Sequence, residues 1–247
     1  MNVLVVVAPG QGSQTPGFLA PWLDVPGVKD RLEWLSAVAG IDLVAHGTTS
    51  DADTIRDTAI AQPLIVGAGL VTMLSLFPHP SAAFSQIGAG AGHSVGEITA
   101  SVGAGVLSAE QAMVFVRERG KGMAAAAAVT ATGMSAVLGG DADVVVAQAE
   151  KHGLTPANMN GAGQIVVAGT MEQLAAFAAD APEGSRVRPL EVAGAFHTHH
   201  MAPAVATLGG YARSISTHDT RVKLISNADG QIVHDGREVL KRLVTQV

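Results

Sequence analysis

The chain has 247 residues, of which 48% are hydrophobic and 15% charged, and its formal net charge at pH 7 is −6. This composition is typical of a soluble globular protein with a large core. An acidic balance with only five lysines argues against a nucleic-acid or anionic-membrane surface. The absence of cysteine excludes disulfides, thiolate metal sites and a cysteine nucleophile, and is compatible with the cytoplasm.

The first half of the chain alternates between predicted strands and helices. The run Val3–Ala8 predicts a first buried strand, and it lacks the basic segment and the apolar length of a signal peptide. The elements expected after it are a helical segment starting near Pro26, a helix over residues 60–76, a strand over 84–91, and helices over 97–104 and 108–127. The last of these begins with a predicted capping box at Ser108-Ala109-Glu110-Gln111. Such alternation is typical of a parallel sheet flanked by helices.

One long uncharged stretch, from Thr58 to Gly96, raises the question of a membrane span. Prolines interrupt it, and no window of membrane-spanning length is cleanly apolar. We therefore predict a buried helix at about Gln62 to Phe77, followed by the buried central strand Phe84–Ala91.

The pattern changes after the alanine-rich segment that ends near residue 128. The expected elements are strands over residues 133–140, 157–160, 164–169 and 186–192, with helices over 141–152 and 170–179. This βαββαβ order is ferredoxin-like. We predict an α/β fold in which a discontinuous core, residues 1–128 and 193–247, carries an inserted small domain at 129–192.

The most informative motif is Gly92-His93-Ser94-Val95-Gly96, a G-x-S-x-G run between a predicted strand and a predicted helix. Glycines two residues either side of a serine permit a sharp strand-to-helix turn. Such a turn exposes the hydroxyl and directs backbone N–H groups at an oxyanion formed there. The alternative is a tight turn whose serine merely caps the helix.

Arg119 falls on the apolar stripe of its predicted helix, at helical spacing from Phe115, Val116 and Met123. A buried guanidinium needs an anion, and its neighbours on the helix supply none. Two interpretations are open. The anion is either a distant acidic side chain in a structural ion pair or the carboxylate of a substrate.

Two further segments supply candidate site residues. His197 follows the last strand of the insert, and a serine nucleophile needs a base of this kind. His197, His199 and His200 also raise the possibility of a metal site, which we do not favour because no further ligand has suitable spacing. Gln11, in a glycine-rich loop after the first strand, is expected at the sheet edge where α/β sites form.

Five segments together resemble the malonyl-CoA:acyl carrier protein transacylase family, and the resemblance runs from residue 3 to the last residue. In chain order they are Pro9–Gly12, Gly92–Glu97, Val116–Gly120, Asn158–Gln164 and Ala195–Thr198. The resemblance implies a hydrolase-like parallel-sheet core with a ferredoxin-like insert, in agreement with the pattern of elements.

The resemblance also implies roles by position. Ser94 would be the nucleophile, His197 its base, and Arg119 the ligand of the malonyl carboxylate. The remaining implied roles belong to Gln11 and Val95 as oxyanion-hole amides, Gln246 as the residue whose backbone carbonyl orients the histidine, and Asn160, Gln164 and Phe196 as substrate-binding residues. In related domains a phenylalanine before the catalytic histidine goes with malonyl selection.

The implied reaction transfers a malonyl group from malonyl-CoA to the thiol of acyl carrier protein through a malonyl-serine ester. Coenzyme A enters as part of the substrate, and no cofactor or metal is expected. We expect a cytoplasmic monomer that binds neither nucleic acid nor membrane. The pathway, fatty acid or polyketide, stays open. The alternatives are a segment of a megasynthase, a serine hydrolase or thioesterase, and an inactive truncated scaffold.

The chain ends at Val247, directly after Gln246. The family continues with a proline-containing segment, a further strand and helices, which would cover one side of the core. For this reason an inactive truncated scaffold is one of the alternatives.

Overall fold

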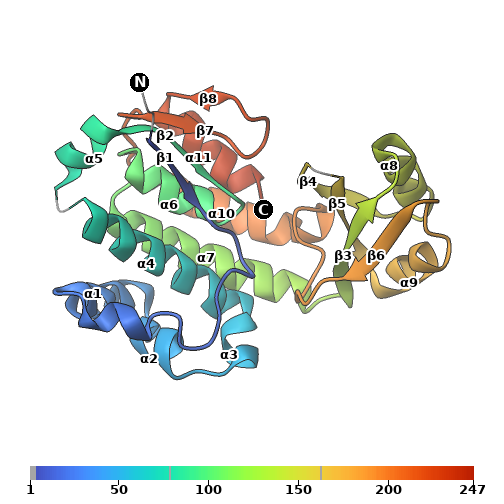
Figure 1. Cartoon of the computed structure of the whole chain (residues 1–247), viewed down its shortest axis with the longest axis horizontal. Coiled ribbons are helices and arrows are strands. Elements are labelled where there is room, and N and C mark those ends of the chain that lie inside the picture. The colour runs from blue at the N-terminus through green and yellow to red at the C-terminus, as the bar shows by residue number, and fades with distance from the viewer. Residues whose placement is uncertain (1–3, 78, 162) are drawn as a thin grey trace. The chain divides into compact units, whose positions relative to one another are not determined.

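A computed structural model describes residues 4–77, 79–161 and 163–247, and the chain forms two compact units (Figure 1). The first comprises Met1–Lys121 with Thr207–Gln246, and the second comprises Gly122–Ala206 with Val247. The insert predicted at residues 129–192 lies inside the second unit, which begins earlier and ends later. Val3, predicted to start the first strand, lies outside the described residues.

The first unit is built on a four-stranded sheet in the order β1-β2-β7-β8. Its strands are β1 (Leu4–Ala8), β2 (Ile87–Gly92), β7 (Lys223–Ile225) and β8 (Ile232–Val233). The first three run parallel to one another, and β8 pairs with β7 in the antiparallel sense. The sheet is therefore mixed, with the parallel part at β1, β2 and β7.

Helices pack around this sheet, and several begin at an aspartate. Asp42, Asp51, Asp57 and Asp235 each accept a backbone N–H of the helix that follows, which satisfies a donor the helix itself leaves unpaired. The helical elements are η1 (Ala20–Asp24), α1 (Val28–Ala39), α2 (Leu43–Thr48), α3 (Ala52–Arg56), α4 (Thr58–Leu76), α5 (Pro80–Gln86), α6 (Gly96–Gly103), α7 (Ala109–Ala127) and α11 (Gly236–Thr245). At α7 the predicted capping box forms, since Ser108 and Gln111 exchange side-chain-to-backbone hydrogen bonds.

The central strand begins later than predicted. Residues 84–86 belong to helix α5, and the strand β2 starts at Ile87. The helix is favoured because Pro80 stands in its first turn and His79 caps it by accepting the N–H of Ser81. The glycine-rich run Ile87–Gly92 is itself the buried strand.

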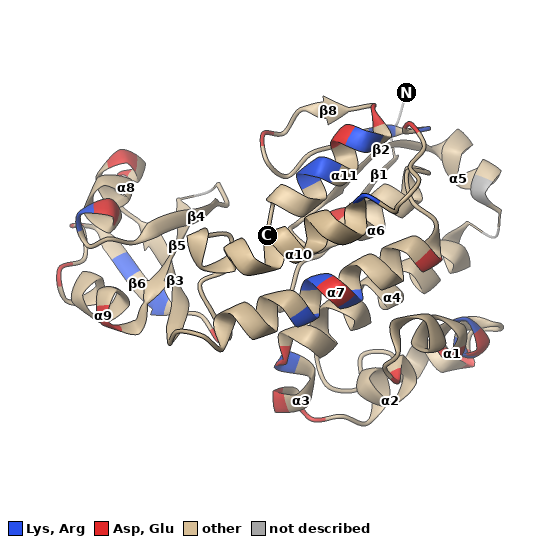
Figure 2. Cartoon of the chain, turned by 180° about the vertical axis from the view of Figure 1, so that it is seen from behind, with Lys and Arg blue, Asp and Glu red and all other residues tan. Residues whose placement is uncertain are grey.

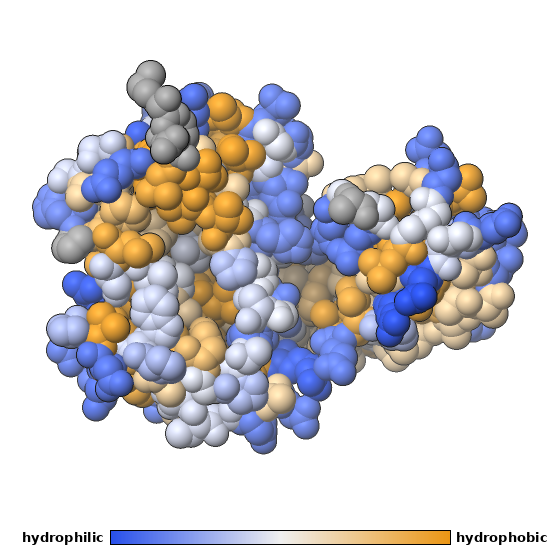
Figure 3. Space-filling model, viewed as in Figure 1, coloured by the Kyte–Doolittle hydropathy of each residue, from blue (hydrophilic) through white to orange (hydrophobic). Residues whose placement is uncertain are grey.

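The prediction that the first strand is buried was wrong. β1 is an edge strand with β2 as its neighbour on one side, and Leu4, Val5 and Val7 are 45%, 47% and 68% exposed. These side chains contribute to the apolar surface that Figure 3 shows over β1. Apolar composition predicts a strand, but its position in the sheet is decided by topology.

Helix α4 is the element that the uncharged stretch predicted. By length and composition alone it could cross a membrane, and a core helix passes the same test. Half of its most apolar window is buried inside the protein. Leu64 and Val66 are fully buried, which fits a core helix.

The second unit contains an antiparallel sheet in the order β4-β5-β3-β6. Its elements follow one another as β3 (Thr132–Gly139), α8 (Ala142–Lys151), β4 (Thr155–Met159), β5 (Gln164–Thr170), α9 (Met171–Ala179) and β6 (Ser185–Pro189). Val137, Val167 and Phe177 are among the residues that form its core. The strand β6 ends at Pro189 instead of residue 192, because the chain turns and Val192 donates to the carbonyl of Leu190. The short helix η2 (His199–Met201) and helix α10 (Ala202–Ala212) follow.

Candidate active site

Ser94 lies in the turn between β2 and α6, with a backbone φ of 50°. Residues other than glycine rarely adopt this left-handed conformation, and where they do the strain points to a functional site. The flanking glycines make the turn possible. A Cβ on Gly92 would collide with the backbone of Gly96 and Glu97, so the end of the strand and the start of the helix touch.

The loop after β1 packs against this turn. A Cβ on Gly96 would collide with the carbonyl oxygens of Ala8 and Pro9, the latter at 2.6 Å, and one on Gly10 would lie 2.6 Å from the His93 ring. The next residue, Gln11, is thereby held beside the turn. The backbone N–H groups of Gln11 and Val95 donate to no acceptor among the described residues. That is compatible with the predicted oxyanion hole, which stays a prediction.

Arg119 projects from the α7 stripe and is 1% exposed. Its Nη2 donates to Ser94 Oγ at 3.2 Å and to Gln246 Oε1 at 3.0 Å, and its Nη1 donates to Gln62 Oε1 at 2.7 Å. Its Nε has no partner in the described part of the chain. Burial lowers the pKa of Arg119 to about 10, so the group stays charged at neutral pH.

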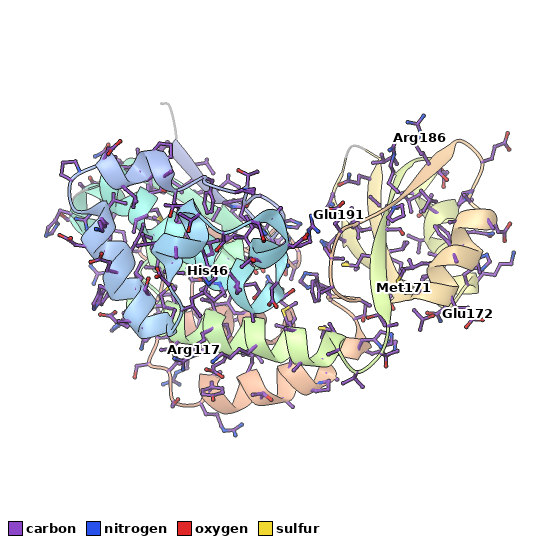
Figure 4. The ribbon with its side chains drawn as sticks, turned by 90° about the horizontal axis from the view of Figure 1, so that it is seen from below. His46, Arg117, Met171, Glu172, Arg186 and Glu191 are labelled. Carbon is purple, nitrogen blue, oxygen red and sulfur yellow. The ribbon has the colours of Figure 1, made fainter. Side chains whose placement is uncertain are left out.

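No carboxylate is bonded directly to Arg119 among the described residues, because its three acceptors are a hydroxyl and two amides. The nearby acid is Glu97, whose negative charge favours the charged form of Arg119. Glu97 forms no direct ion pair with Arg119, because the Gln246 side chain lies between them. Figure 2 shows acidic and basic residues clustered at the middle of α7. Arg117, labelled in Figure 4, donates to Glu118 and to the backbone carbonyl of Val38.

Glu97 connects the parts of this site. It is a buried residue in the first turn of α6, and its carboxylate accepts the side-chain amide of Gln246 and the backbone N–H of Asn227. Burial raises the pKa of Glu97, and nearby Arg119 and Arg242 oppose that rise. Asn227 in turn accepts the backbone N–H of Ser94 through Oδ1 at 2.7 Å.

Gln62, Glu97 and Asn227 carried no predicted role in the site. Gln62 was visible only as a polar residue in an uncharged helix, and Asn227 carried no signal. Glu97 stood inside the quoted motif, three residues after the serine, where one turn of helix returns it to the same face. For Gln246, the role predicted for its backbone carbonyl stays a prediction, whereas its side chain joins Arg119 to Glu97.

The remaining predicted residues lie in the second unit. His197 has a φ of 61° and, with Ser94, is one of the two non-glycine residues at positive φ in the described ranges. Its turn is fixed by Thr198, whose hydroxyl donates to the carbonyl of Ala195, and by Ala195, whose N–H donates to Thr132 Oγ1. Phe196 is buried. The pairing of His197 with Ser94 stays a prediction.

Asn160 and Gln164 face each other across the β4–β5 turn. Asn160 Nδ2 donates to Gln164 Oε1 at 2.8 Å, and their backbones pair as well. These contacts account for both side chains without a ligand, and their predicted binding role stays a prediction. Across the described residues, no group of three or more His, Asp or Glu side chains could hold a metal ion.

Known proteins similar to this chain match nearly all of its length. Residues 5–240 match the family model described as an acyl transferase domain. A malonyl CoA-acyl carrier protein transacylase of Mycobacterium bovis is 46% identical over 99% of this chain and 81% of the relative. The crystal structure of MCAT from Mycobacterium tuberculosis, 46% identical, superposes with a TM-score of 0.94 over 99% of this chain and 81% of that one. A type II PKS malonyl-transacylase, solved in complex with its acyl-carrier protein, is 27% identical with a TM-score of 0.86, over 99% of this chain and 81% of that one.

Proposed function

The chain belongs to the acyl transferase family, among the malonyl CoA-acyl carrier protein transacylases, and from this premise we propose that it transfers malonyl groups through an ester on Ser94. The enzyme takes the malonyl group from malonyl-CoA and passes it to the thiol of acyl carrier protein. The observation that carries the proposed serine chemistry is the Arg119–Ser94 contact. It sets a buried cation with free donors 3.2 Å from a hydroxyl on a strained turn.

In the first half-reaction, Ser94 Oγ attacks the thioester carbonyl carbon while its proton passes to a base, proposed to be His197. The C–O bond forms, the C–S bond breaks, and the coenzyme A thiol leaves with a proton. The backbone amides of Val95 and Gln11 are proposed to stabilise the oxyanion of the tetrahedral intermediate. In the second half-reaction the pantetheine thiol gives its proton to the base and its sulfur attacks the ester carbonyl carbon. The C–S bond forms, the C–O bond to Ser94 breaks, and Ser94 Oγ takes the proton from the base.

Arg119 is proposed to bind the free carboxylate of the malonyl group. A guanidinium has five N–H donors, and the hydrogen bonds to Gln62, Ser94 and Gln246 use three of them. The remaining two, on Nε and Nη1, lie on different edges of the guanidinium, so a carboxylate can bind one of them directly and would bind bidentately by replacing Ser94 or Gln246 at Nη2. A buried cation without an anion is costly. Arg119 therefore favours an acyl group that carries a carboxylate, such as malonyl, over an uncharged acyl group.

Several finer points belong to the same proposal. The second unit is proposed to be an inserted ferredoxin-like domain, which its βαββαβ order and antiparallel sheet support. We also propose that the enzyme works in the cytoplasm as a monomer, without metal or resident cofactor. We further propose that the enzyme supplies malonyl groups to polyketide as well as fatty acid synthesis, because it is similar to the type II PKS malonyl-transacylase.

Intact mass measurement tests the proposal. Incubation with malonyl-CoA is expected to add one malonyl group to the wild type and none to Ser94→Ala, with peptide mapping placing the group on Ser94. Adding acyl carrier protein in its pantetheine-bearing form is expected to remove the group from the enzyme and load the carrier. Release to water instead would indicate a hydrolase or thioesterase, and no adduct would indicate an inactive scaffold.

A further inference from the structure

Gln246 has two chemically different ends, and the structure uses them for different purposes. Its oxygen accepts from Arg119 Nη2, and its nitrogen donates to Glu97. An amide rotated by half a turn would direct its N–H₂ group at the guanidinium, donor against donor. Because a carboxylate accepts hydrogen bonds and donates none when ionised, Glu97 permits only one of these orientations.

Glu97 is itself fixed by a second contact. Its other oxygen accepts the backbone N–H of Asn227 at 2.5 Å, and Asn227 Oδ1 accepts the backbone N–H of Ser94. One buried carboxylate thus holds, through Gln246, the group next to the proposed substrate carboxylate and, through Asn227, the backbone of the nucleophile. Neither chain of contacts uses the Glu97 charge in a direct ion pair with Arg119.

We propose that Glu97 is a positioning residue that fixes the amide orientation of Gln246, so that Arg119 is held by a neutral oxygen and keeps its charge for the malonyl carboxylate. This inference rests on the proposed function. A carboxylate placed directly on Arg119 would hold the guanidinium equally well, but it would compete with the substrate for the charge. An acid one residue further away orients the cation and leaves it available.

The first test is Glu97→Gln, which keeps the size of the side chain. Glutamine offers one acceptor where glutamate offers two, so either the Asn227 N–H or the Gln246 N–H₂ loses its acceptor, or Gln246 turns and loses Arg119. We expect kcat/KM with malonyl-CoA to fall by about 10- to 100-fold, the typical effect of losing a hydrogen bond to a charged group. Acylation by acetyl-CoA, which lacks the carboxylate, is expected to fall by less, so the malonyl-to-acetyl ratio drops.

The second test exchanges the two side chains in Glu97→Gln/Gln246→Glu. The carboxylate introduced at position 246 could then accept from Arg119 and from the amide introduced at position 97, and the oxygen of that amide remains for Asn227. The number of hydrogen bonds and the net charge therefore match the wild type, and we expect the thermal stability lost in Glu97→Gln to be recovered. The malonyl-to-acetyl ratio is expected to stay about 10-fold or more below the wild-type ratio, because the introduced carboxylate bonds directly to Arg119 and competes with the substrate.

Glu238→Gln is the matched control, since Glu238 is a partly exposed acid of α11 that contacts Lys241 and Arg242. It is expected to leave the ratio unchanged. An unchanged ratio in Glu97→Gln, or a wild-type ratio in the exchanged variant, would overturn the inference. If Glu97→Gln does not fold, the exchanged variant decides alone. Failure of the proposed function is distinguished from these outcomes, because the wild type would then form no malonyl adduct.

Discussion

Ser94 and His197 share a strained backbone but are held in it by different means. The Ser94 turn is fixed by parts of the chain far away in sequence, through the Asn227 side chain and the close approach of the loop after β1. At the His197 turn, Thr198 bonds to its near neighbour Ala195, and Ala195 bonds to Thr132, which is distant in sequence. The Ser94 turn therefore depends on segments brought together by the fold of the first unit, whereas a local hydrogen bond contributes to the His197 turn.

The largest expected effect comes from removing the imidazole at the His197 turn. His197→Ala is expected to slow acylation of Ser94 by about 10²–10⁴-fold, the usual contribution of a general base. The hydrogen bonds of Ala195 with Thr132 and of Thr198 with Ala195 are kept in this variant, so we expect it to fold. Stopped-flow release of coenzyme A measures the rate, and thermal unfolding measures stability. A rate within twofold of the wild type would remove His197 from the mechanism.

The Ser94 turn is expected to be most sensitive to crowding. Gly96→Ala places a methyl group against the carbonyl oxygens of Ala8 and Pro9, which are backbone atoms that cannot move aside. We expect a loss of about 1–3 kcal/mol in the free energy of unfolding, with loss of acylation.

Gly210→Ala, in helix α10, is the matched control for Gly96→Ala. A Cβ there meets its nearest atom, Nη2 of Arg213, only at 3.9 Å. It is expected to leave stability unchanged or to raise it by up to about 1 kcal/mol. Urea unfolding measures both variants, and equal effects would show that the turn is not closely packed.

Phe196, the residue before His197, is expected to determine the preference for malonyl-CoA over methylmalonyl-CoA. If its buried ring limits the acyl pocket, the wild type prefers malonyl-CoA to methylmalonyl-CoA by roughly 10- to 200-fold in kcat/KM. Phe196→Ser is expected to narrow that ratio, mainly by improving methylmalonyl transfer, because a close-packed pocket resists an extra methyl group. Competition between the two thioesters, read by mass spectrometry of the carrier, gives the ratio. The same ratio in a folded variant would mean that Phe196 only packs the turn.

The smallest effect is a dependence of stability on pH at Glu97. Burial raises the pKa of Glu97 above 4.5 in the folded state, so the folded protein holds this proton to a higher pH than the unfolded chain does. The stability of the wild type relative to Glu97→Gln is therefore expected to fall as pH rises from below 4.5 through the raised pKa, and then to level off. Urea unfolding of both proteins between about pH 4 and pH 7 measures it. A difference that grows with pH would mean that Arg119 and Arg242 outweigh burial.

Features set by local spacing could be predicted from the sequence. The G-x-S-x-G pattern predicted the Ser94 turn because both glycines act within two residues of the serine. Helical spacing likewise predicted that Arg119 is buried, and its 1% exposure confirms this. The capping box of α7 and the order of elements in the second unit also depend on neighbours in sequence.

Features set by tertiary packing could not be predicted. Gln62 and Asn227 meet Arg119 and Ser94 across 57 and 133 residues, and no local pattern marks such partners. The strand β1 is as apolar as a buried strand, yet the topology sets it at the sheet edge. The start of β2 was misplaced because Phe84 favours a strand, whereas Pro80 and the His79 cap begin a helix that includes it.

The most direct test of the account is the acyl preference of Arg119→Ala. The buried guanidinium beside Ser94 is proposed to recognise the malonyl carboxylate. The ratio of malonyl to acetyl acylation is therefore predicted to fall by about 10²-fold or more, while acetylation of Ser94 is largely kept. Intact mass after parallel incubations with malonyl-CoA and acetyl-CoA measures this ratio. Equal loss of both reactions in a folded variant would contradict the account and assign Arg119 to structure alone.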